Sequence, residues 1–339
     1  MGFGVLDRRP GDGVVAGGGP ILLPEYRDPE AGRLDLASAT MVLAAVLAVI
    51  YGLKEIAADG LAALPVLAIV AGLVIGVVFV RRQRTLDTPL IDLRLFAERM
   101  FSVSLGVLTL SAVVMMGVSY LIAQYLQLVI GLSPLAAGLW MLPPLGVGIG
   151  SMMLAPMIVN RVRPGYVIGA GLAVAAAGFA VLSQVGDADG LAVVISGLVL
   201  VFAGLMPVAA LGVDIVLGAA PPEHAGAASA ISETTQEFGG ALGIAILGSI
   251  GTAVYRGQVS DAATAGLPAR AAAAVQDTLG GATGAAEQLP AALLATATQA
   301  FTDGLQVAAA VSALALAGVA ILAVTALRGL VAPHTRSFS

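Results

Sequence analysis

The chain has 339 residues, of which 58% are hydrophobic and 11% are charged, and its formal net charge is −5. Soluble proteins carry roughly 25% charged residues, so this composition excludes an ordinary water-soluble domain, whose core does not bury that much apolar surface. The lack of cysteine excludes disulfides, thiol catalysis and cysteine metal sites. The two histidines, His224 and His334, are too far apart in sequence to suggest a metal cluster, and the acidic balance gives no reason to expect a nucleic-acid partner.

Eight apolar stretches follow one another along the chain. A bilayer core of about 30 Å requires roughly 20 apolar residues in a helix, and the stretches near that length are 36–54, 62–81, 102–124, 136–159, 165–184, 191–217, 235–255 and 305–327. They are continuous and do not alternate at period two, which predicts helices and argues against a transmembrane barrel. The predicted fold class is therefore all-α, a polytopic membrane protein with about eight transmembrane helices.

The basic residues are divided unequally between the two sides of the predicted membrane. Thirteen of the sixteen fall on one side, and the other side receives Lys54, Arg256 and Arg270. The positive-inside rule assigns the basic side, with both termini, to the cytoplasm of a cell inner (plasma) membrane protein. The long connection 256–303 is then extracellular, and its alanine-rich parts predict short helices broken at Gly280–Gly281 and Pro290. Two interpretations of this connection are a solvated loop and an extracellular lid.

Glycines recur four residues apart in three of the predicted helices. The pairs are Gly146 and Gly150, Gly165 and Gly169, and Gly239 and Gly243. Small residues at this spacing share one helix face and let two helices approach closely in lipid. Close packing alone explains such faces, and a sliding interface in a protein that changes shape is the alternative.

Three acidic residues lie in or near the predicted helices. Asp214 is near the cytoplasmic end of the sixth, and Glu233 and Glu237 share a face near the start of the seventh. Charged groups within a membrane are costly and commonly functional, and carboxylates in low-dielectric surroundings hold protons more tightly. The sequence therefore indicates proton or cation handling, with helix capping in the headgroup region as the alternative for the two glutamates and an interfacial position for the aspartate.

The third predicted helix carries a polar stripe near its end. Tyr120, Gln124 and Gln127 recur at i, i+4 and i+7 on an otherwise apolar surface. Such a stripe faces either a substrate cavity or another helix, to which it donates hydrogen bonds.

Several strings resemble one transporter family. They are LLPEYRDPEAGRLDL at 22–36, PLIDLRLF at 89–96, YLQLVIGLSPLAAGLWMLPPLGVGI at 125–149 and PPEHAGAASAISETTQEFGGALGIAILGSI at 221–250. In order and spacing they resemble the C-terminal portion of fourteen-spanning drug:proton antiporters, the EmrB/QacA-like group of the major facilitator superfamily. The resemblance implies six spans, two linking spans and six further spans, of which this sequence carries the last eight.

That architecture implies a domain organisation. Residues 1–35 are expected to form a cytoplasmic tail, 36–100 the two linker helices with a basic loop, 101–330 the C-terminal six-helix bundle with the extracellular loop 256–303, and 331–339 a cytoplasmic tail. The first residues do not resemble the family's preceding span. We therefore expect a piece of a transporter whose first six spans are absent.

The resemblance also implies roles for particular residues. Glu233, Thr234, Glu237, Phe238 and Gly239 match the family's E-T-x-x-(D/E)-(L/F)-G pattern, whose acids handle substrate or protons. The 136–159 helix lacks an acid that the family often has there. The turn after this helix, at Asn160, Arg161 and Arg163, resembles a degenerate copy of the superfamily's loop motif. Asparagine replaces the motif's aspartate here, which weakens an ion-pair latch. The positive-inside rule alone also accounts for the two arginines.

The sequence thus predicts a multidrug:proton antiporter of the cell membrane, with amphipathic or cationic small molecules and protons as its partners, the lipid bilayer as its solvent and a proton gradient in place of a cofactor. A non-transporting remnant, or a half that needs a separate N-terminal bundle, is the alternative. An enzyme is disfavoured because no nucleophile–base or metal constellation is visible in the sequence.

Overall fold

The computed structural model describes residues 35–59, 62–86, 93–186, 190–220, 225–259 and 267–327. These residues are nearly all helical and contain no strand, which confirms the predicted fold class. Eight helical segments within them are long and apolar enough to cross a bilayer. Both histidines, most of the string at 22–36, and the predictions for 1–34 and 328–339, including six of the sixteen basic residues, lie outside the described residues.

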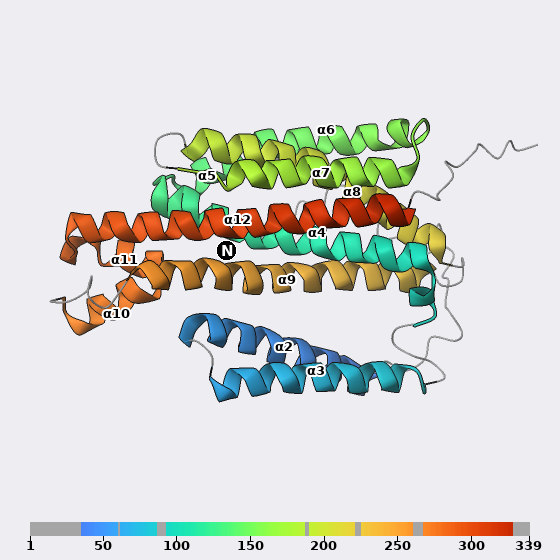
Figure 1. Cartoon of the computed structure of the whole chain (residues 1–339), viewed down its shortest axis with the longest axis horizontal. Helices are drawn as coiled ribbons and strands as arrows, with labels where there is room; N and C mark the ends of the chain where they lie inside the picture. The colour runs from blue at the N-terminus through green and yellow to red at the C-terminus, as the bar shows by residue number, and fades with distance from the viewer. Residues whose placement is uncertain are drawn as a thin grey trace, which may run out of the picture. The chain divides into compact units, whose positions relative to one another are not determined.

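The spanning segments agree with the predicted stretches in number and order (Figure 1). The helices are α2 (Leu36–Asp59), α3 (Ala63–Gln83), α4 (Arg99–Gln124), α5 (Pro134–Trp140), α6 (Leu142–Val159), α7 (Pro164–Leu182), α8 (Gly190–Ala219), α9 (Ala225–Gln258), α10 (Ala269–Asp277), α11 (Leu279–Gly284) and α12 (Ala291–Leu327). Short 3-10 turns precede α4 and α12, at Leu95–Ala97 (η1) and Ala286–Gln288 (η4). A π-helix, η2 (Tyr125–Val129), continues α4.

Two helices are longer than the sequence pattern predicts. Helix α9 begins ten residues before the predicted stretch and α12 begins fourteen residues before it. At 1.5 Å per residue, α9 is roughly 51 Å long and α12 roughly 55 Å long, well beyond a bilayer core of about 30 Å. Hydropathy marks the part of a helix that is soluble in lipid, and it does not reveal a helix that continues into water.

Helices α2 and α3 form an antiparallel hairpin. Gly72 of α3 packs against the backbone of Ala45 and the side chain of Val49, while Gly52 of α2 packs against Pro65 and Ile69. At the far end of the hairpin, the buried Gln83 side chain donates a hydrogen bond of 2.7 Å to the Ser38 hydroxyl.

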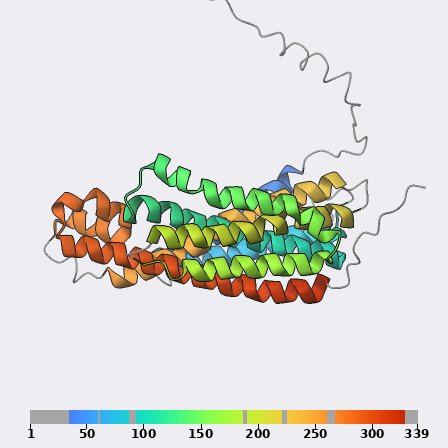
Figure 2. The same cartoon turned by 90° about the horizontal axis from the view of Figure 1, so that it is seen from above.

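The remaining spanning helices form a bundle with a continuous apolar core. Helix α4 packs on α9, α8 and α12, α7 packs on α8 and α12, and α6 packs on α8. Figure 1 shows α4, α9, α12 and α7 running side by side, and Figure 2 shows the same helices from above. The core contains the fully buried side chains of Tyr125, Phe179, Leu172 and Leu305.

Glycine contacts hold the bundle helices at close range. Gly117 of α4 and Gly243 of α9 lie so close to the opposite helix that a Cβ added to either glycine would collide with the backbone of that helix. Gly171 packs against Gly204 and Gly178 against Gly197 at the α7–α8 interface in the same way. Since lipid supplies little hydrophobic drive for helix association, these small faces provide the van der Waals contact that holds the helices together.

The three predicted glycine pairs differ in what they contact. Gly239 and Gly243 both pack against α4, and Gly169 packs against Val324 of α12. Gly146 and Gly150 have no atom within reach of an added Cβ, so close packing at that pair was wrongly predicted. Gly148, between them, makes the contact instead, against Phe202 and Met206 of α8.

Prolines and a π-helix set the helix boundaries in the first half of the bundle. Pro134 and Pro164 occupy the first position of α5 and α7, where a missing N–H costs nothing. The Ser133 hydroxyl caps α5 by accepting a 3.2 Å hydrogen bond from the Ala136 amide. Gly131, which ends the π-helical segment, has φ of 78°, a backbone conformation that favours glycine.

The glycine contacts predict a contrast between two identical substitutions. Gly243→Ala should lower the free energy of unfolding by about 1–3 kcal/mol, because the new methyl group meets the Val113 carbonyl and α4 has to move. Gly146→Ala should leave it unchanged or raise it by up to about 1 kcal/mol through helix propensity, because open space surrounds that position. Thermal unfolding of the purified variants in detergent measures both, and equal unfolding temperatures would contradict the packing role of Gly243.

Candidate functional site

The three acidic residues singled out in the sequence are on α8 and α9. Glu233 lies eight residues and Glu237 twelve residues after the start of α9, which is roughly 12 and 18 Å along its axis. Asp214 lies five residues before the end of α8. All three side chains are exposed in the bundle.

Two glycine contacts show that Asp214 and Glu237 lie at one level of the bundle. Gly212, two residues before Asp214, packs against the Leu108 side chain of α4. Gly239, two residues after Glu237, packs against the Thr109 carbonyl of α4. Because Leu108 and Thr109 are consecutive, α8 and α9 bring Asp214 and Glu237 to the same turn of α4, and Glu233 lies one turn nearer the start of α9. Within the described residues, no three acidic or histidine side chains are close enough to hold a metal ion.

The predicted polar stripe lies at a different level. The Tyr120 ring is 46% exposed and lies beside Gly248 of α9. Gly248 is eleven residues beyond Glu237, or roughly 16 Å further along the helix. Gln127 lies in the π-helix, is exposed, and donates a 3.1 Å hydrogen bond to the Ala123 carbonyl, while Gln124 is half-buried. The structure therefore separates the stripe from the carboxylates along the bundle axis.

A buried tyrosine next to the stripe was missed in the sequence. The Tyr125 side chain is fully buried, and its hydroxyl donates a 3.2 Å hydrogen bond to the Gly186 carbonyl. Gly190 at the start of α8 gives the ring room, because a Cβ there would collide with the hydroxyl oxygen. Gln306 of α12 donates a 2.6 Å hydrogen bond to the Val185 carbonyl. Both polar side chains thus bind the backbone of residues 185 and 186 just after α7, a pairing between distant parts of the chain that the sequence pattern does not reveal.

The turn between α6 and α7 carries the three predicted loop-motif residues. Asn160 follows the last residue of α6, and Arg163 precedes Pro164 at the start of α7. The side chains of Asn160, Arg161 and Arg163 are exposed. The structure places them together at one turn, as the sequence predicts for a short connection.

The long connection after α9 is a folded cap. Its helices α10 and α11 pack on the ends of α9 and α12 around Tyr255, Val275, Leu279 and Ala297, and Leu128 and Val129 of η2 pack against the same cluster. The predicted break at Gly280–Gly281 is wrong, because both glycines lie inside α11. The chain breaks at Thr278 instead, whose hydroxyl caps α11 by accepting a 3.1 Å hydrogen bond from the Gly281 amide. Gly281 lies in α11 because its missing side chain admits the Ala274 carbonyl.

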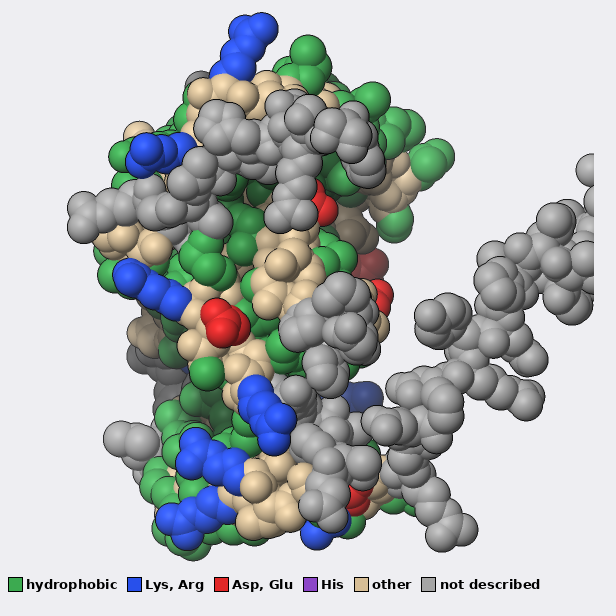
Figure 3. All heavy atoms as spheres, turned by 90° about the vertical axis from the view of Figure 1, so that its right-hand side faces the viewer, with side chains coloured by type: hydrophobic (Ala, Val, Ile, Leu, Met, Phe, Trp, Pro, Cys, Tyr) green, Lys and Arg blue, Asp and Glu red, His purple; other side chains and the backbone are tan. Residues whose placement is uncertain are grey.

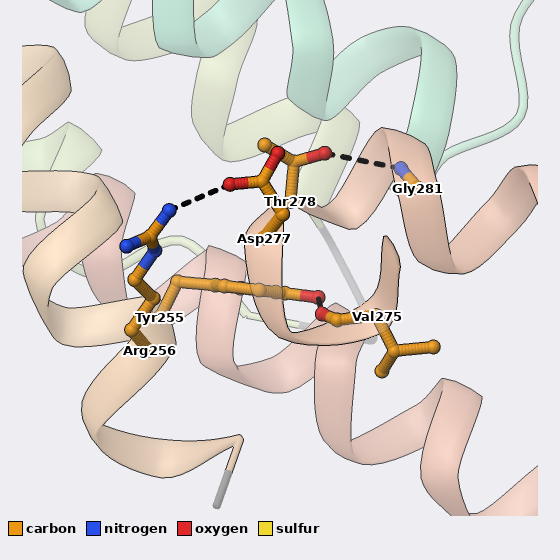
Figure 4. Close-up of polar contacts among 6 residues, drawn as sticks. All are labelled: Tyr255, Arg256, Val275, Asp277, Thr278 and Gly281. Carbon is orange, nitrogen blue, oxygen red and sulfur yellow. Dashed lines mark hydrogen bonds and ion pairs between the residues drawn. The ribbon is translucent and has the colours of Figure 1, made fainter. Parts of the chain in front are cut away.

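Polar contacts fasten the cap to α9 (Figure 4). The buried Tyr255 hydroxyl donates a 2.7 Å hydrogen bond to the Val275 carbonyl of α10. Its neighbour Arg256 forms a 2.6 Å ion pair with Asp277, whose side chain is 64% exposed. Exposed ion pairs contribute little stability, so the tyrosine, with a fully buried cluster around it, is the stronger attachment.

The fold and these surfaces define a polytopic α-helical membrane protein with a glycine-packed six-helix bundle, a helical cap and acidic side chains at one level. The sequence profile of the Major Facilitator Superfamily matches residues 35–244. The chain belongs to this superfamily of transporters.

Curated relatives carry names of efflux and resistance proteins. The chain is 36% identical over 311 residues to the multidrug efflux pump LfrA of Mycolicibacterium smegmatis, an alignment that covers 90% of the chain and 61% of that protein. It is 30% identical to the puromycin resistance protein pur8 of Streptomyces alboniger, over 72% of the chain and 49% of that protein. It is 31% identical to the methyl viologen resistance protein SmvA of Salmonella typhimurium, over 79% of the chain and 55% of that protein. The chain therefore spans about half to three fifths of these relatives.

The cap contacts predict a local effect of Tyr255→Phe. Loss of the hydrogen bond leaves the Val275 carbonyl without its buried partner, which costs about 1 kcal/mol or more. Amide hydrogen exchange of α10 should then become roughly fivefold faster. Tyr166→Phe, which changes an exposed tyrosine of α7, should leave α10 unaffected. Unchanged α10 exchange in the Tyr255 variant would show that the cap is held by apolar packing alone.

Proposed function

We propose that this chain is the proton- and substrate-handling part of a proton-coupled exporter of amphipathic or cationic compounds in the plasma membrane. The observation that carries the proposal is the placement of Asp214 and Glu237 at one level of a major facilitator bundle, with Glu233 one turn away on α9 and all three side chains exposed. The names of the relatives, which include a multidrug efflux pump and resistance proteins for puromycin and methyl viologen, support the substrate class.

The carboxylates suit an exchange of protons for cations. An ionised carboxylate attracts a cationic group, and protonation removes that attraction. Glu233 and Glu237 lie one turn apart on α9, so binding of one proton changes the charge that a substrate meets at the other. The energy comes from the proton gradient, so the proposal needs no bound cofactor, and because no bond of the substrate is broken it describes a transporter and not an enzyme.

The glycine contacts beside the acids suit a helix that moves. Gly239, Gly240 and Gly243 bring α9 against α4 on the face next to the glutamates. The Thr109 methyl group and the Met116 side chain of α4 pack into the spaces that Gly239 and Gly240 leave, so a shift of α9 along α4 requires only these side chains to repack. We infer that such a shift exposes the carboxylates first to one side of the membrane and then to the other.

The proposal includes a second bundle. Substrate sites of major facilitator transporters lie near the bilayer midplane between two six-helix halves that rock against each other, and the described residues hold one bundle. Helix α6 presents a large apolar surface, with Met153 73% and Met157 66% exposed. A docked N-terminal half would cover part of such a surface. The competing proposal is a remnant that inserts in the membrane and transports nothing.

Transport assays separate these proposals. Efflux of a cationic dye should appear when efflux-deficient bacteria produce the chain together with the N-terminal six spans of a relative such as LfrA. It should fall to the background rate when the chain carries Glu233→Gln or Glu237→Gln, because these variants keep the size of the side chain and lose its charge. Glu287→Gln, which changes an exposed acid of the cap, is the matched control and should retain efflux.

Two outcomes count against the proposal. Efflux by the chain alone at the same rate would remove the need for a second bundle. Equal loss of efflux in the Glu233 and Glu287 variants, at equal amounts of protein in the membrane, would remove the specific role of α9.

The proposed orientation is tested with single cysteines, because the chain has none of its own. We expect Ala273→Cys, in the cap, to react with a membrane-impermeant maleimide added to intact cells. Arg161→Cys, in the turn between α6 and α7, should react only after permeabilisation, because the positive-inside rule places it in the cytoplasm. Both positions are exposed, so burial does not account for a difference. The reverse labelling pattern would invert the proposed topology.

A further inference from the structure

The α2–α3 hairpin has an open groove on its surface near one of its ends. The groove has a volume of about 390 Å³, and its lining is almost entirely apolar, formed by Thr40, Met41 and Ala44 of α2 and Val74, Ile75 and Val78 of α3. A volume of this size lies in the range of sites that hold small ligands. Each of the two helices buries only 17% of its most apolar stretch within the chain, so the hairpin presents most of its surface outward.

Contacts on either side of the groove explain why it is open. On one side, Gly72 brings α3 against the backbone of α2 at Ala45. On the other side, Gln83 and Arg82 both donate hydrogen bonds to the Ser38 hydroxyl, at 2.7 and 3.2 Å. Between these two attachments the lining side chains, Met41 and Ile75 among them, leave the space open. An added Cβ at Gly76 likewise meets no atom within 4 Å.

The end of the groove is basic. Arg81, Arg82 and Arg84 lie three, four and six residues after Val78 at the end of α3, and Arg81 and Arg84 are exposed. Among the described residues of the hairpin, Asp35 before α2 is the acid at this end, so the three arginines outnumber it. Figure 3 faces the end of the helices where α3 ends and shows basic side chains beside hydrophobic surface.

We propose that this groove binds one anionic phospholipid, with an acyl chain between α2 and α3 and the phosphate on Arg81, one turn after Val78. Charge complementarity and the apolar lining together select this occupant. A free anion gains nothing from the apolar groove, and a zwitterionic lipid has no net charge to match the basic end of the hairpin. Basic pockets between membrane helices bind acidic headgroups in this way, and the positive-inside rule places the site in the cytoplasmic leaflet.

The site is tested by lipid binding to the full chain. Purified protein in detergent is titrated with phosphatidylglycerol or phosphatidylcholine of identical acyl chains, and native mass spectrometry counts the bound lipids. We expect one phosphatidylglycerol to bind at least roughly tenfold more tightly than phosphatidylcholine. Arg81→Gln should abolish this preference, Arg84→Gln on the face of Val80 should retain it, and inorganic phosphate should neither bind nor compete.

Matched variants separate the groove from charge and bulk in general. Val78→Phe fills the groove and should weaken phosphatidylglycerol binding, whereas Val80→Phe, an exposed position on the opposite face of α3, should not. Arg161→Gln removes the same charge from the α6–α7 turn and should bind the lipid normally. Circular dichroism and unfolding temperature establish that all variants are folded.

Three results would overturn the proposal. Equal affinity for both lipids shows that the groove is ordinary lipid-facing surface. Competition by inorganic phosphate shows a site for anions alone. Binding that is unaffected by Val78→Phe shows that the lipid lies elsewhere, which leaves the groove to another helix or to bulk lipid.

Discussion

Close approach of helices at glycine is the interaction on which the rest of the structure depends. Inside lipid, every backbone group must find its hydrogen bond within its own helix. Helices formed in this way have little hydrophobic reason to associate, so association rests on contact between surfaces. The pairs Gly117–Gly243 and Gly171–Gly204 supply that contact, and they fix which faces of α4, α9, α7 and α8 are turned inward. The other faces of these helices therefore pack against further helices or form the outer surface of the bundle.

The acidic residues have their arrangement because of those contacts. Gly212 and Gly239 pack against consecutive residues of α4, and each lies two positions from an acidic residue. The same interface therefore both joins the helices and brings charges from two helices to one level. These carboxylates are far from the cap and from Tyr120, so the acidic residues and the polar end of α4 occupy separate parts of the bundle.

The cap forms because α9 and α12 are longer than the hydrocarbon core of a membrane is thick. Beyond the hydrocarbon, water again drives apolar side chains together, and the ends of α9, α12 and η2 enclose a second small core with α10 and α11. Apolar packing around Tyr255 and Val275 holds the cap together, and Gly281 of α11 packs closely against Ala274 of α10. The same cluster joins the ends of α9 and α12 to η2, which continues α4.

Hydropathy alone was enough to predict the helical class, the eight spanning segments and their order, because a membrane helix is defined by the length of its apolar run. The acidic residues were also visible in the sequence, since charge is rare in such runs. The sequence did not determine where α9 and α12 begin, because their polar turns outside the membrane resemble loop. It did not show that Gly148 packs while Gly146 and Gly150 do not, nor that Tyr125 reaches Gly186, because a periodic pattern describes one helix and these contacts join two. Which faces meet is decided by the tertiary structure, since only the packed bundle selects among several equally apolar surfaces.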